Sequence, residues 1–204
     1  MDDRYFTIAQ RSQQEIKVKG SRFIARTIPA GSVRDAEEQL AGIRRLEYAA
    51  THNCFAYVVG VPVVKADFKY SDDGEPNGTA GRPIYDVIAG SGVTNVLLVV
   101  TRYFGGTKLG TGGLAKAYGE AAGLAMHHSG VRENFITERL QVEVAFPVYD
   151  SLVKTIHRFG ASQAQTDFTD RVSLLLDIRQ SRTEQLIAEI LELSKGKAKI
   201  EKVS

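Results

Sequence analysis

Hydrophobic residues along the first two thirds of the chain recur at intervals that predict strands alternating with helices. Segments rich in β-branched and aromatic residues predict strands at Glu15–Val18, Ser21–Ile28, Thr51–Val59 and Val93–Thr101. Apolar residues stepping by three or four predict helices after Ser32, from Arg82-Pro83 and from Leu114. Because Val93–Thr101 is apolar almost throughout, we expect that strand to be buried on both faces.

The ends of these elements carry their own signals. Ser32, with Asp35 three residues later, indicates a helix start. Pro83 is expected in the first helical turn, and Gly90 is expected to end that helix in the left-handed conformation. The glycine-rich segment Gly105–Gly113 is predicted to be a loop that joins the buried strand to the helix at Leu114.

Beyond residue 135 the alternation becomes regular. Strands are predicted at Glu138–Ala145, Ala161–Phe168, Arg171–Ile178 and Ala198–Val203, and helices at Val148–Phe159 and Ser181–Ser194. The order βαββαβ is that of ferredoxin-like folds. We therefore expect an α+β protein with two domains, residues 1–135 and 136–204.

Composition narrows the function classes only slightly. The 204 residues are 43% hydrophobic and carry a net charge of +2, and acids balance bases in both parts of the chain, so neither is a basic arm. One cysteine, Cys54, excludes an internal disulfide and a multi-cysteine zinc site. With no signal peptide and no apolar run of membrane-spanning length, the sequence predicts a cytoplasmic protein without membrane contact.

Glycine is concentrated in one stretch, Tyr70–Gly119, which holds eleven of the nineteen glycines. Placed inside helices or strands, eleven glycines would cost about 5–10 kcal/mol, comparable to the stability of a small domain. Most must therefore lie in turns, at caps, or where another molecule approaches the backbone closely.

A strand, a glycine loop and a helix in succession form a general anion-binding arrangement. The spacing satisfies neither the P-loop nor the dinucleotide motif, and the glycines could instead serve tight helix packing. The candidate RNA- or anion-binding surface consists of Arg82, Arg102, Tyr103, Gly105, Gly106, Lys108, Gly110, Thr111, Gly112, Gly113 and Lys116.

The acidic loop Asp72, Asp73, Gly74 and Glu75 is a second candidate. Its carboxylates could ligate Mg²⁺ or Ca²⁺, but the EF-hand pattern is absent. Hydrogen bonds and ion pairs that fix the loop, with Arg82 or Arg102, are favoured, so we expect no metal and no cofactor. His52 and Cys54 share one face of a strand; a nucleophile with its base is the alternative to an ordinary half-buried strand.

Four blocks of sequence resemble the YigZ/IMPACT family: KGSRFIA (19–25), HNCFAYVVG (52–60), SDDGEPNGTAGRP (71–83) and VVTRYFGGTKLGTGGLAKAYG (99–119). The resemblance implies a first domain like domain 2 of ribosomal protein S5, and a ferredoxin-like second domain similar to elongation-factor modules. It also implies a regulator or accessory factor of translation without established catalytic residues.

Two functions follow as hypotheses. The first is a non-catalytic protein that binds RNA or the ribosome through the glycine-rich surface, with a protein partner also possible. In this hypothesis the basic residues of that surface contact phosphates, and Tyr103, Phe104 and Tyr118 stack on bases or pack the sheet. The second is a phosphate-binding enzyme that uses Mg-nucleotide, with Asp72, Asp73 and Glu75 holding Mg²⁺ opposite Lys108. Both require the acidic loop, Arg102 and the glycine segment to meet in one concave patch.

Overall fold

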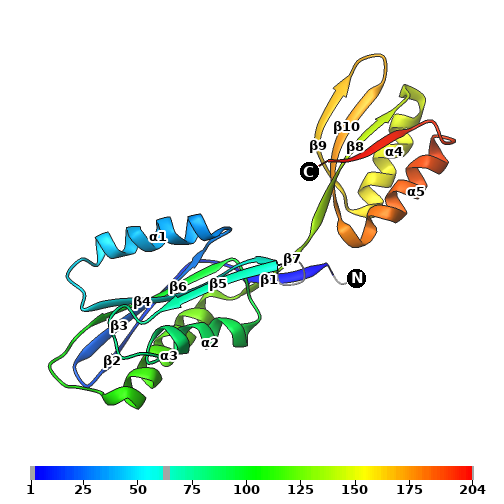
Figure 1. Ribbon diagram of the computed structural model, residues 1–204. Coiled ribbons are helices and arrows are strands. Elements are labelled where there is room, and N and C mark those ends of the chain that lie inside the picture. The colour runs from blue at the N-terminus through cyan, green and yellow to red at the C-terminus, as the bar shows by residue number, and fades with distance from the viewer. Residues whose placement is uncertain (1–2, 62–64, 204) are drawn as a thin grey trace. The chain divides into compact units, whose positions relative to one another are not determined.

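A computed structural model describes residues 3–61 and 65–203 (Figure 1). The chain is α+β and consists of two compact units. One unit is Tyr5–Asn134, and the other runs from Phe135 to the C-terminus and includes Asp3 and Arg4. No helix within the described ranges combines the length and the apolar character needed to cross a membrane.

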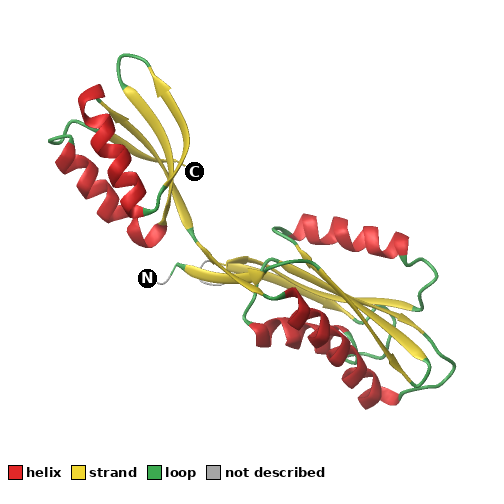
Figure 2. Cartoon of the chain, turned by 180° about the vertical axis from the view of Figure 1, so that it is seen from behind, coloured by secondary structure: helices red, strands yellow, loops and turns green. Residues whose placement is uncertain are grey.

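The first unit is built on a five-stranded antiparallel sheet. In spatial order its strands are β2 (Ser12–Val18), β3 (Ser21–Pro29), β6 (Val96–Tyr103), β4 (His52–Val61) and β5 (Lys65–Ser71). Helix α1 (Val33–Leu46) covers one face of the sheet, and α2 (Gly81–Ser91) and α3 (Gly110–Ser129) cover the other (Figures 1 and 2).

Strand β6 lies in the middle of this sheet and is buried on both faces, as its unbroken apolar run predicts. Leu98 and Val100 pack into the core shared with α2 and α3. Leu97 and Val99 point the opposite way, into the core under α1. Two separate cores therefore hold the sheet between its helices.

Several boundaries differ from those predicted. Ser32 accepts a hydrogen bond from the Asp35 amide at the start of α1, as expected. Gly90 does not end α2; Gly92 does, with a φ of 69°. The glycine segment is not a loop throughout, because α3 begins at Gly110.

The short strands β1 (Arg4–Ile8) and β7 (Val131–Phe135), which pair with each other, had no clear sequence signal. The segment 61–69, for which the sequence predicts a loop or an edge strand, lies partly outside the described residues, and its described end belongs to edge strand β5.

The second unit has the predicted ferredoxin-like order βαββαβ. Its elements are β8 (Thr137–Val144), α4 (Phe146–Phe159), β9 (Ser162–Phe168), β10 (Val172–Arg179), the 3₁₀ turn η1 (Gln180–Arg182), α5 (Thr183–Leu193) and β11 (Lys199–Val203). The strands form an antiparallel sheet in the order β11-β8-β10-β9, and α4 and α5 cover one of its faces (Figure 1). Leu140, Leu174 and Leu186 are fully buried between the sheet and these helices.

Candidate functional site

A cavity of about 400 Å³ lies at one end of the first unit, where the acidic loop, the end of β6 and the glycine segment come together. Its lining consists of Thr51, His52, Glu75, Pro76, Arg102, Phe104, Lys108, Leu109, Gly110, Thr111 and Leu114. Segments that are up to 63 residues apart in the sequence, from Thr51 to Leu114, thus meet at one concave place, as both hypotheses require. We call this the sheet-end cavity.

Strand pairing sets the floor of the sheet-end cavity. Arg102 on β6 lies opposite Phe23 on β3 and opposite His52 on β4, so the three side chains form one row across the sheet. The Arg102 guanidinium lies 5.5 Å from the Phe23 ring centroid and 5.4 Å from that of Phe104. Held between two rings, the Arg102 side chain is only 6% exposed.

A buried ion pair completes the floor. Arg102 Nη1 donates to Glu75 Oε1 at 2.6 Å, and the Tyr118 hydroxyl donates to the same oxygen at 2.8 Å. The Glu75 side chain is 4% exposed. Removing either charge would strand the other in a poorly solvated place, which is strongly destabilising. The sequence correctly suggested that Arg102 could pair with an acid of the loop, but this burial leaves its guanidinium in the floor and not on an outer phosphate-contacting surface.

The hydrogen bond of one ring nitrogen of His52 fixes the role of the other ring nitrogen in the cavity. Its Nδ1 lies 2.8 Å from the carbonyl oxygen of Asp73. A carbonyl only accepts, so Nδ1 carries the hydrogen. In the neutral ring Nε2 is therefore an acceptor, and it lies 3.9 Å from Glu75 Oε1. The sequence drew attention to His52 only through its spacing from Cys54.

The carboxylates of Asp72 and Asp73, the first two of the acidic loop, accept hydrogen bonds from other parts of the first unit. Asp72 accepts hydrogen bonds from the amides of Gly78, Ala80 and Gly81, and so caps the start of α2. Asp73 accepts from Arg44 Nη2 at 2.6 Å and from the Asn53 amide at 2.7 Å. No group of three or more metal-ligating side chains occurs among the residues that the structure describes.

Cys54 is buried beneath the same loop, where its thiol donates to the Asp72 carbonyl at 3.0 Å. Burial raises the pKa of Cys54 to about 12. The thiolate is the reactive form of cysteine, so this residue is held in its unreactive state at neutral pH. The arrangement favours the structural interpretation of the His52–Cys54 pair over that of a nucleophile with its base.

The glycines of the segment 105–113 have different reasons to be there. A Cβ on Gly105 would lie 1.9 Å from the carbonyl carbon of Gly20, so this glycine permits two backbones to touch. Gly106 and Gly110 adopt φ angles of 87° and 73°, which favour glycine. Gly112 has neither reason: its φ is ordinary, and a Cβ would meet no atom within 4 Å. Fold packing therefore explains only part of the segment.

Of the predicted site residues, Glu75, Arg102, Lys108, Gly110 and Thr111 line the sheet-end cavity. The side chains of Tyr103, Arg82 and Lys116 are among those outside its lining. Tyr103 follows Arg102 on a strand, so it points to the opposite face, where its hydroxyl donates to Glu47 at 2.6 Å. Arg82, on the first turn of α2, pairs with Asp86 at 2.7 Å. Lys116 lines a neighbouring hollow of about 220 Å³ with Lys19; Leu109 belongs to both hollows.

Two exposed aromatic side chains belong to segments that border the cavity. The sequence indicated Phe104, together with Tyr103 and Tyr118, as a residue that could stack on bases or pack the sheet, but it gave no indication of Tyr48. Tyr48 is 86% exposed in the turn that leads into β4, and Phe104 is 47% exposed where it lines the cavity. Leu109 and Leu114 add apolar walls. Tyr48 lies in a turn outside any periodic pattern, so the sequence carried no signal for it.

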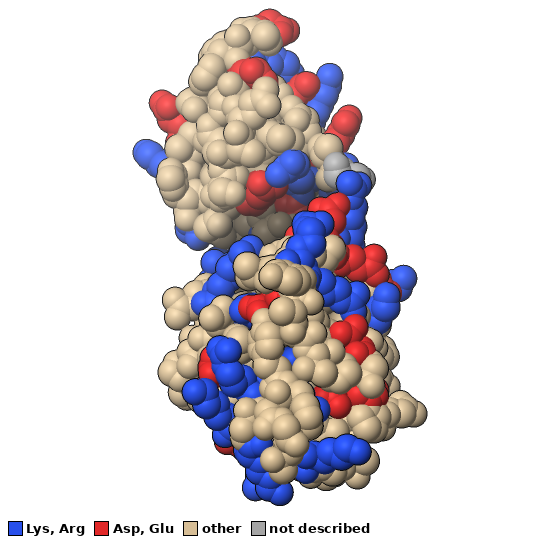
Figure 3. Space-filling model, turned by 90° about the vertical axis from the view of Figure 1, so that its left-hand side faces the viewer, with Lys and Arg blue, Asp and Glu red and all other residues tan. Residues whose placement is uncertain are grey.

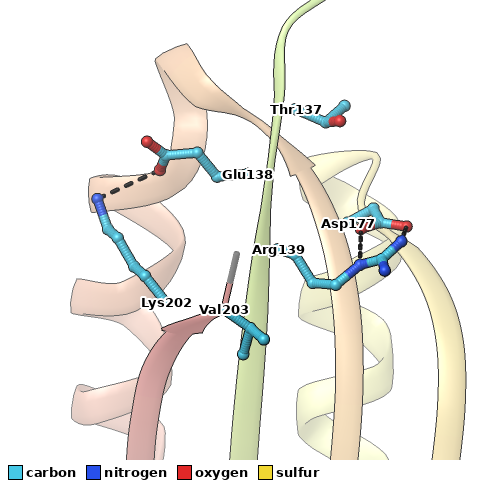
Figure 4. A pocket seen from close by; sticks show the side chains of 6 residues that line it. All are labelled: Thr137, Glu138, Arg139, Asp177, Lys202 and Val203. Carbon is cyan, nitrogen blue, oxygen red and sulfur yellow. Dashed lines mark hydrogen bonds and ion pairs between the residues drawn. The ribbon is translucent and has the colours of Figure 1, made fainter.

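A hollow in the second unit serves as a contrast. It measures about 460 Å³ and is lined by residues of β8, β10 and β11 (Figure 4). Arg139 forms two hydrogen bonds with Asp177, of 2.7 and 3.0 Å, and Glu138 lies 3.2 Å from Lys202 (Figure 4). The Arg139 guanidinium lowers the pKa of Asp177. The charges of this hollow compensate one another and leave little for a charged ligand to neutralise.

Charge on the visible surface is mixed. Figure 3 shows Lys and Arg side chains in several separate groups, interleaved with Asp and Glu, so neither unit presents one continuous basic face in this view. Lys108 and Lys116 differ from most neighbours because no described carboxylate lies within 4.0 Å of either amine. Positive charge near the cavity is therefore local.

Comparison with known proteins places both units in families. Residues 19–126 match the Impact N-terminal domain, and residues 142–197 match a domain of unknown function, DUF1949. IMPACT family member YvyE of Bacillus subtilis is 31% identical over 198 residues, covering 96% of this chain and 89% of that protein. IMPACT family member YigZ of Escherichia coli is 29% identical over 180 residues, covering 88% of each. A solved structure titled "Crystal structure of an hypothetical protein" matches with a TM-score of 0.73 and 26% identity, over 100% of this chain and 99% of that one.

Proposed function

The chain belongs to the IMPACT family, and from that membership we propose that it is a non-catalytic accessory factor of translation that binds RNA, on the ribosome, through the sheet-end cavity and its rim. One observation carries the proposal. At a single concave place the chain brings together Lys108, whose amine has no described carboxylate within 4.0 Å, the half-exposed ring of Phe104 and the exposed backbone of Gly110.

Each of these groups suits single-stranded RNA. Lys108 supplies a charge for a phosphate, and its amine has no described carboxylate within 4.0 Å. Phe104 presents a ring face on which a base can stack. Gly112 offers backbone without a side chain at the first turn of α3, where amides point outward. Lys19 and Lys116 line the neighbouring hollow, which shares Leu109 with the cavity, so a bound strand that continues past Leu109 would meet both lysines.

The alternative function, an enzyme that uses Mg-nucleotide, receives less support. It needs Asp72, Asp73 and Glu75 as ligands of Mg²⁺. Asp72 holds three backbone amides, Asp73 holds Arg44 and Asn53, and Glu75 holds Arg102 and Tyr118. Recruiting them to a metal would dismantle the loop that forms the cavity.

Ribosome co-sedimentation over a series of salt concentrations tests the proposal. Purified full-length protein is expected to pellet with ribosomes in 50 mM KCl and to be released as salt rises, because phosphate contacts release counterions. Lys108→Ala should lower affinity about 10-fold and reduce the slope of log affinity against log salt by about 0.7 for single-stranded RNA. Lys65→Ala, which removes a lysine that is 78% exposed on edge strand β5, is the matched control.

Two results would contradict the proposal. The first is the absence of any binding to ribosomes or to single-stranded RNA in 50 mM KCl. The second is binding that survives nuclease treatment and is unaffected by Lys108→Ala, which would point to a protein partner.

A further inference from the structure

We infer that the sheet-end cavity holds one nucleotide that bears a terminal phosphate, so that the protein recognises the end of an RNA strand and not its interior. This inference rests on the proposed function and names the ligand of the same site. The shared chemistry is that of a nucleoside monophosphate, which either a free nucleotide or a phosphorylated RNA end could supply.

The size of the cavity limits the ligand. At about 400 Å³ it falls near the lower end of the range of roughly 300–1,000 Å³ that small-molecule sites occupy. One nucleotide fits this space, whereas a stack of several bases does not. The floor is closed, since the side chains of Arg102 and Glu75 are only 6% and 4% exposed, so a nucleotide can enter only from the rim.

The lining separates into an apolar and a polar part. Phe104, Leu109 and Leu114 form walls for a flat ring. At the floor, His52 Nε2 offers an acceptor in the neutral ring, because Nδ1 carries the hydrogen. The Arg102 guanidinium offers donors. A nucleobase combines an apolar face with donors and acceptors on its edge, and so matches both parts.

The phosphate is expected at the rim, beside Lys108 and the first turn of α3. This helix runs for 20 residues from Gly110, and no described side chain caps its first amides. Gly110 and Thr111 of that turn line the cavity. A second observation concerns the floor below: Arg102 lines the cavity, and its buried Nε has no acceptor within the part of the chain that the structure describes, so one donor of the floor is left without a partner.

The distribution of lysines favours a strand end. An interior nucleotide must send the strand out of the cavity in two directions, and each exit would need its own cations. Beyond Lys108, the lysines near the cavity, Lys19 and Lys116, both line the hollow on the other side of Leu109. A strand that starts in the cavity and leaves over Leu109 uses all three.

Competition binding with the full-length protein tests this inference. An internally labelled single-stranded RNA is displaced by one unlabelled 10-nucleotide sequence in four forms: with a 5′-phosphate, with a 3′-phosphate, with hydroxyls at both ends, and circular. One phosphorylated form is expected to compete about 10-fold better than the hydroxyl and circular forms. Free nucleoside monophosphate and inorganic phosphate are added as separate competitors; the first is expected to displace the labelled RNA and the second is not.

Glycine variants keep the test independent of folding. Gly112→Ala introduces a methyl group without an intrachain clash and is expected to abolish the preference for the phosphorylated end. Gly123→Ala makes the same change in the middle of α3, also in open space, and should leave the preference intact.

The outcomes separate this inference from the proposed function. Equal competition by all four RNA forms would overturn the inference while RNA binding stands. Binding of free nucleoside monophosphate by calorimetry, without any RNA binding, would support the cavity assignment and overturn the proposed function. Binding of neither would overturn both.

Discussion

Each face of the first unit's sheet carries an arginine, a glutamate and a tyrosine that contact one another, but the two groups have different surroundings. On the face covered by α2 and α3, Arg102 pairs with Glu75, which also accepts from the Tyr118 hydroxyl. On the face covered by α1, Arg26 pairs with Glu47, which also accepts from the Tyr103 hydroxyl. We call these the cavity trio and the α1 trio.

Their neighbours differ. Arg26 has two further acceptors, Gln13 Oε1 at 2.8 Å and Thr101 Oγ1 at 3.3 Å. Among the described acceptors, the Arg102 guanidinium meets Glu75 and, at a longer 3.4 Å, Ser21 Oγ, and its Nε has none. The α1 trio is a closed polar network, whereas the cavity trio leaves capacity unused beside an open space. The same three residue types therefore form a purely structural network under α1, whereas in the cavity trio they border a space that a ligand can enter.

The largest expected difference between the two trios is the loss of folding stability when the glutamate of each is removed. Glu75→Ala leaves Arg102 buried without a counter-charge and is expected to lower the free energy of unfolding of the first unit by about 3–5 kcal/mol. Glu47→Ala leaves Arg26 with Gln13 and Thr101, so a smaller loss of about 1.5–3 kcal/mol is expected. Urea unfolding followed by circular dichroism measures both; a larger loss for Glu47→Ala would reverse the comparison.

Ring removal tests whether only the cavity face meets RNA. Phe104→Ala should weaken RNA binding by about 1–3 kcal/mol, the usual worth of one base stacked on an aromatic side chain. Tyr103→Ala removes the ring of the α1 trio and should leave affinity unchanged, because that ring lies on the opposite face. Fluorescence anisotropy with single-stranded RNA measures both. Comparable losses for the two variants would mean that RNA does not distinguish the faces.

Alkaline titration should distinguish Tyr118 of the cavity trio from Tyr103 of the α1 trio, with a smaller effect on stability than the glutamate variants have. Burial raises the pKa of Tyr118 far above its ordinary value, while the hydrogen bond to Glu47 is the first cause of the raised pKa of Tyr103. A raised folded pKa contributes stability that is present below the unfolded pKa of about 10 and is lost as pH rises above it. For Tyr118 the loss is about 1.4 kcal/mol per pH unit.

Ultraviolet absorbance of tyrosinate follows this directly. Tyr103→Phe should remove one group that ionises before unfolding, whereas Tyr118→Phe should remove one that ionises only with unfolding. Ionisation of Tyr118 in the native protein would contradict the burial on which the comparison depends.

Local patterns were enough to predict most of the fold. The buried strand β6, the cap at Ser32 and the order of the second unit follow from apolar periodicity and capping residues, which depend on near neighbours. Strands β1 and β7 were missed because each is short and is stabilised by a partner more than 120 residues away. Gly90 was wrong as a helix end because Gly92, two residues later, adopts the left-handed conformation.

The candidate site was harder to predict because it depends on strand register. The row of Phe23, Arg102 and His52 exists only when three strands are aligned. The sequence grouped Tyr103 with Arg102, although neighbours on a strand face opposite ways. It also counted Asp72 and Asp73 among candidate ligands, although the fold uses both to fix the loop.

The most direct test of the sheet-end cavity is a nuclear magnetic resonance titration of the ¹⁵N-labelled full-length protein with a single-stranded RNA that carries a terminal phosphate. The amides of Lys108, Gly110, Thr111 and Gly112 are expected to shift together and to saturate with the affinity measured by competition. Amides around Glu47 in the α1 trio and around Asp177 in the second unit should not move. Saturable shifts confined to either of those places, with none at Gly110–Gly112, would contradict the assignment.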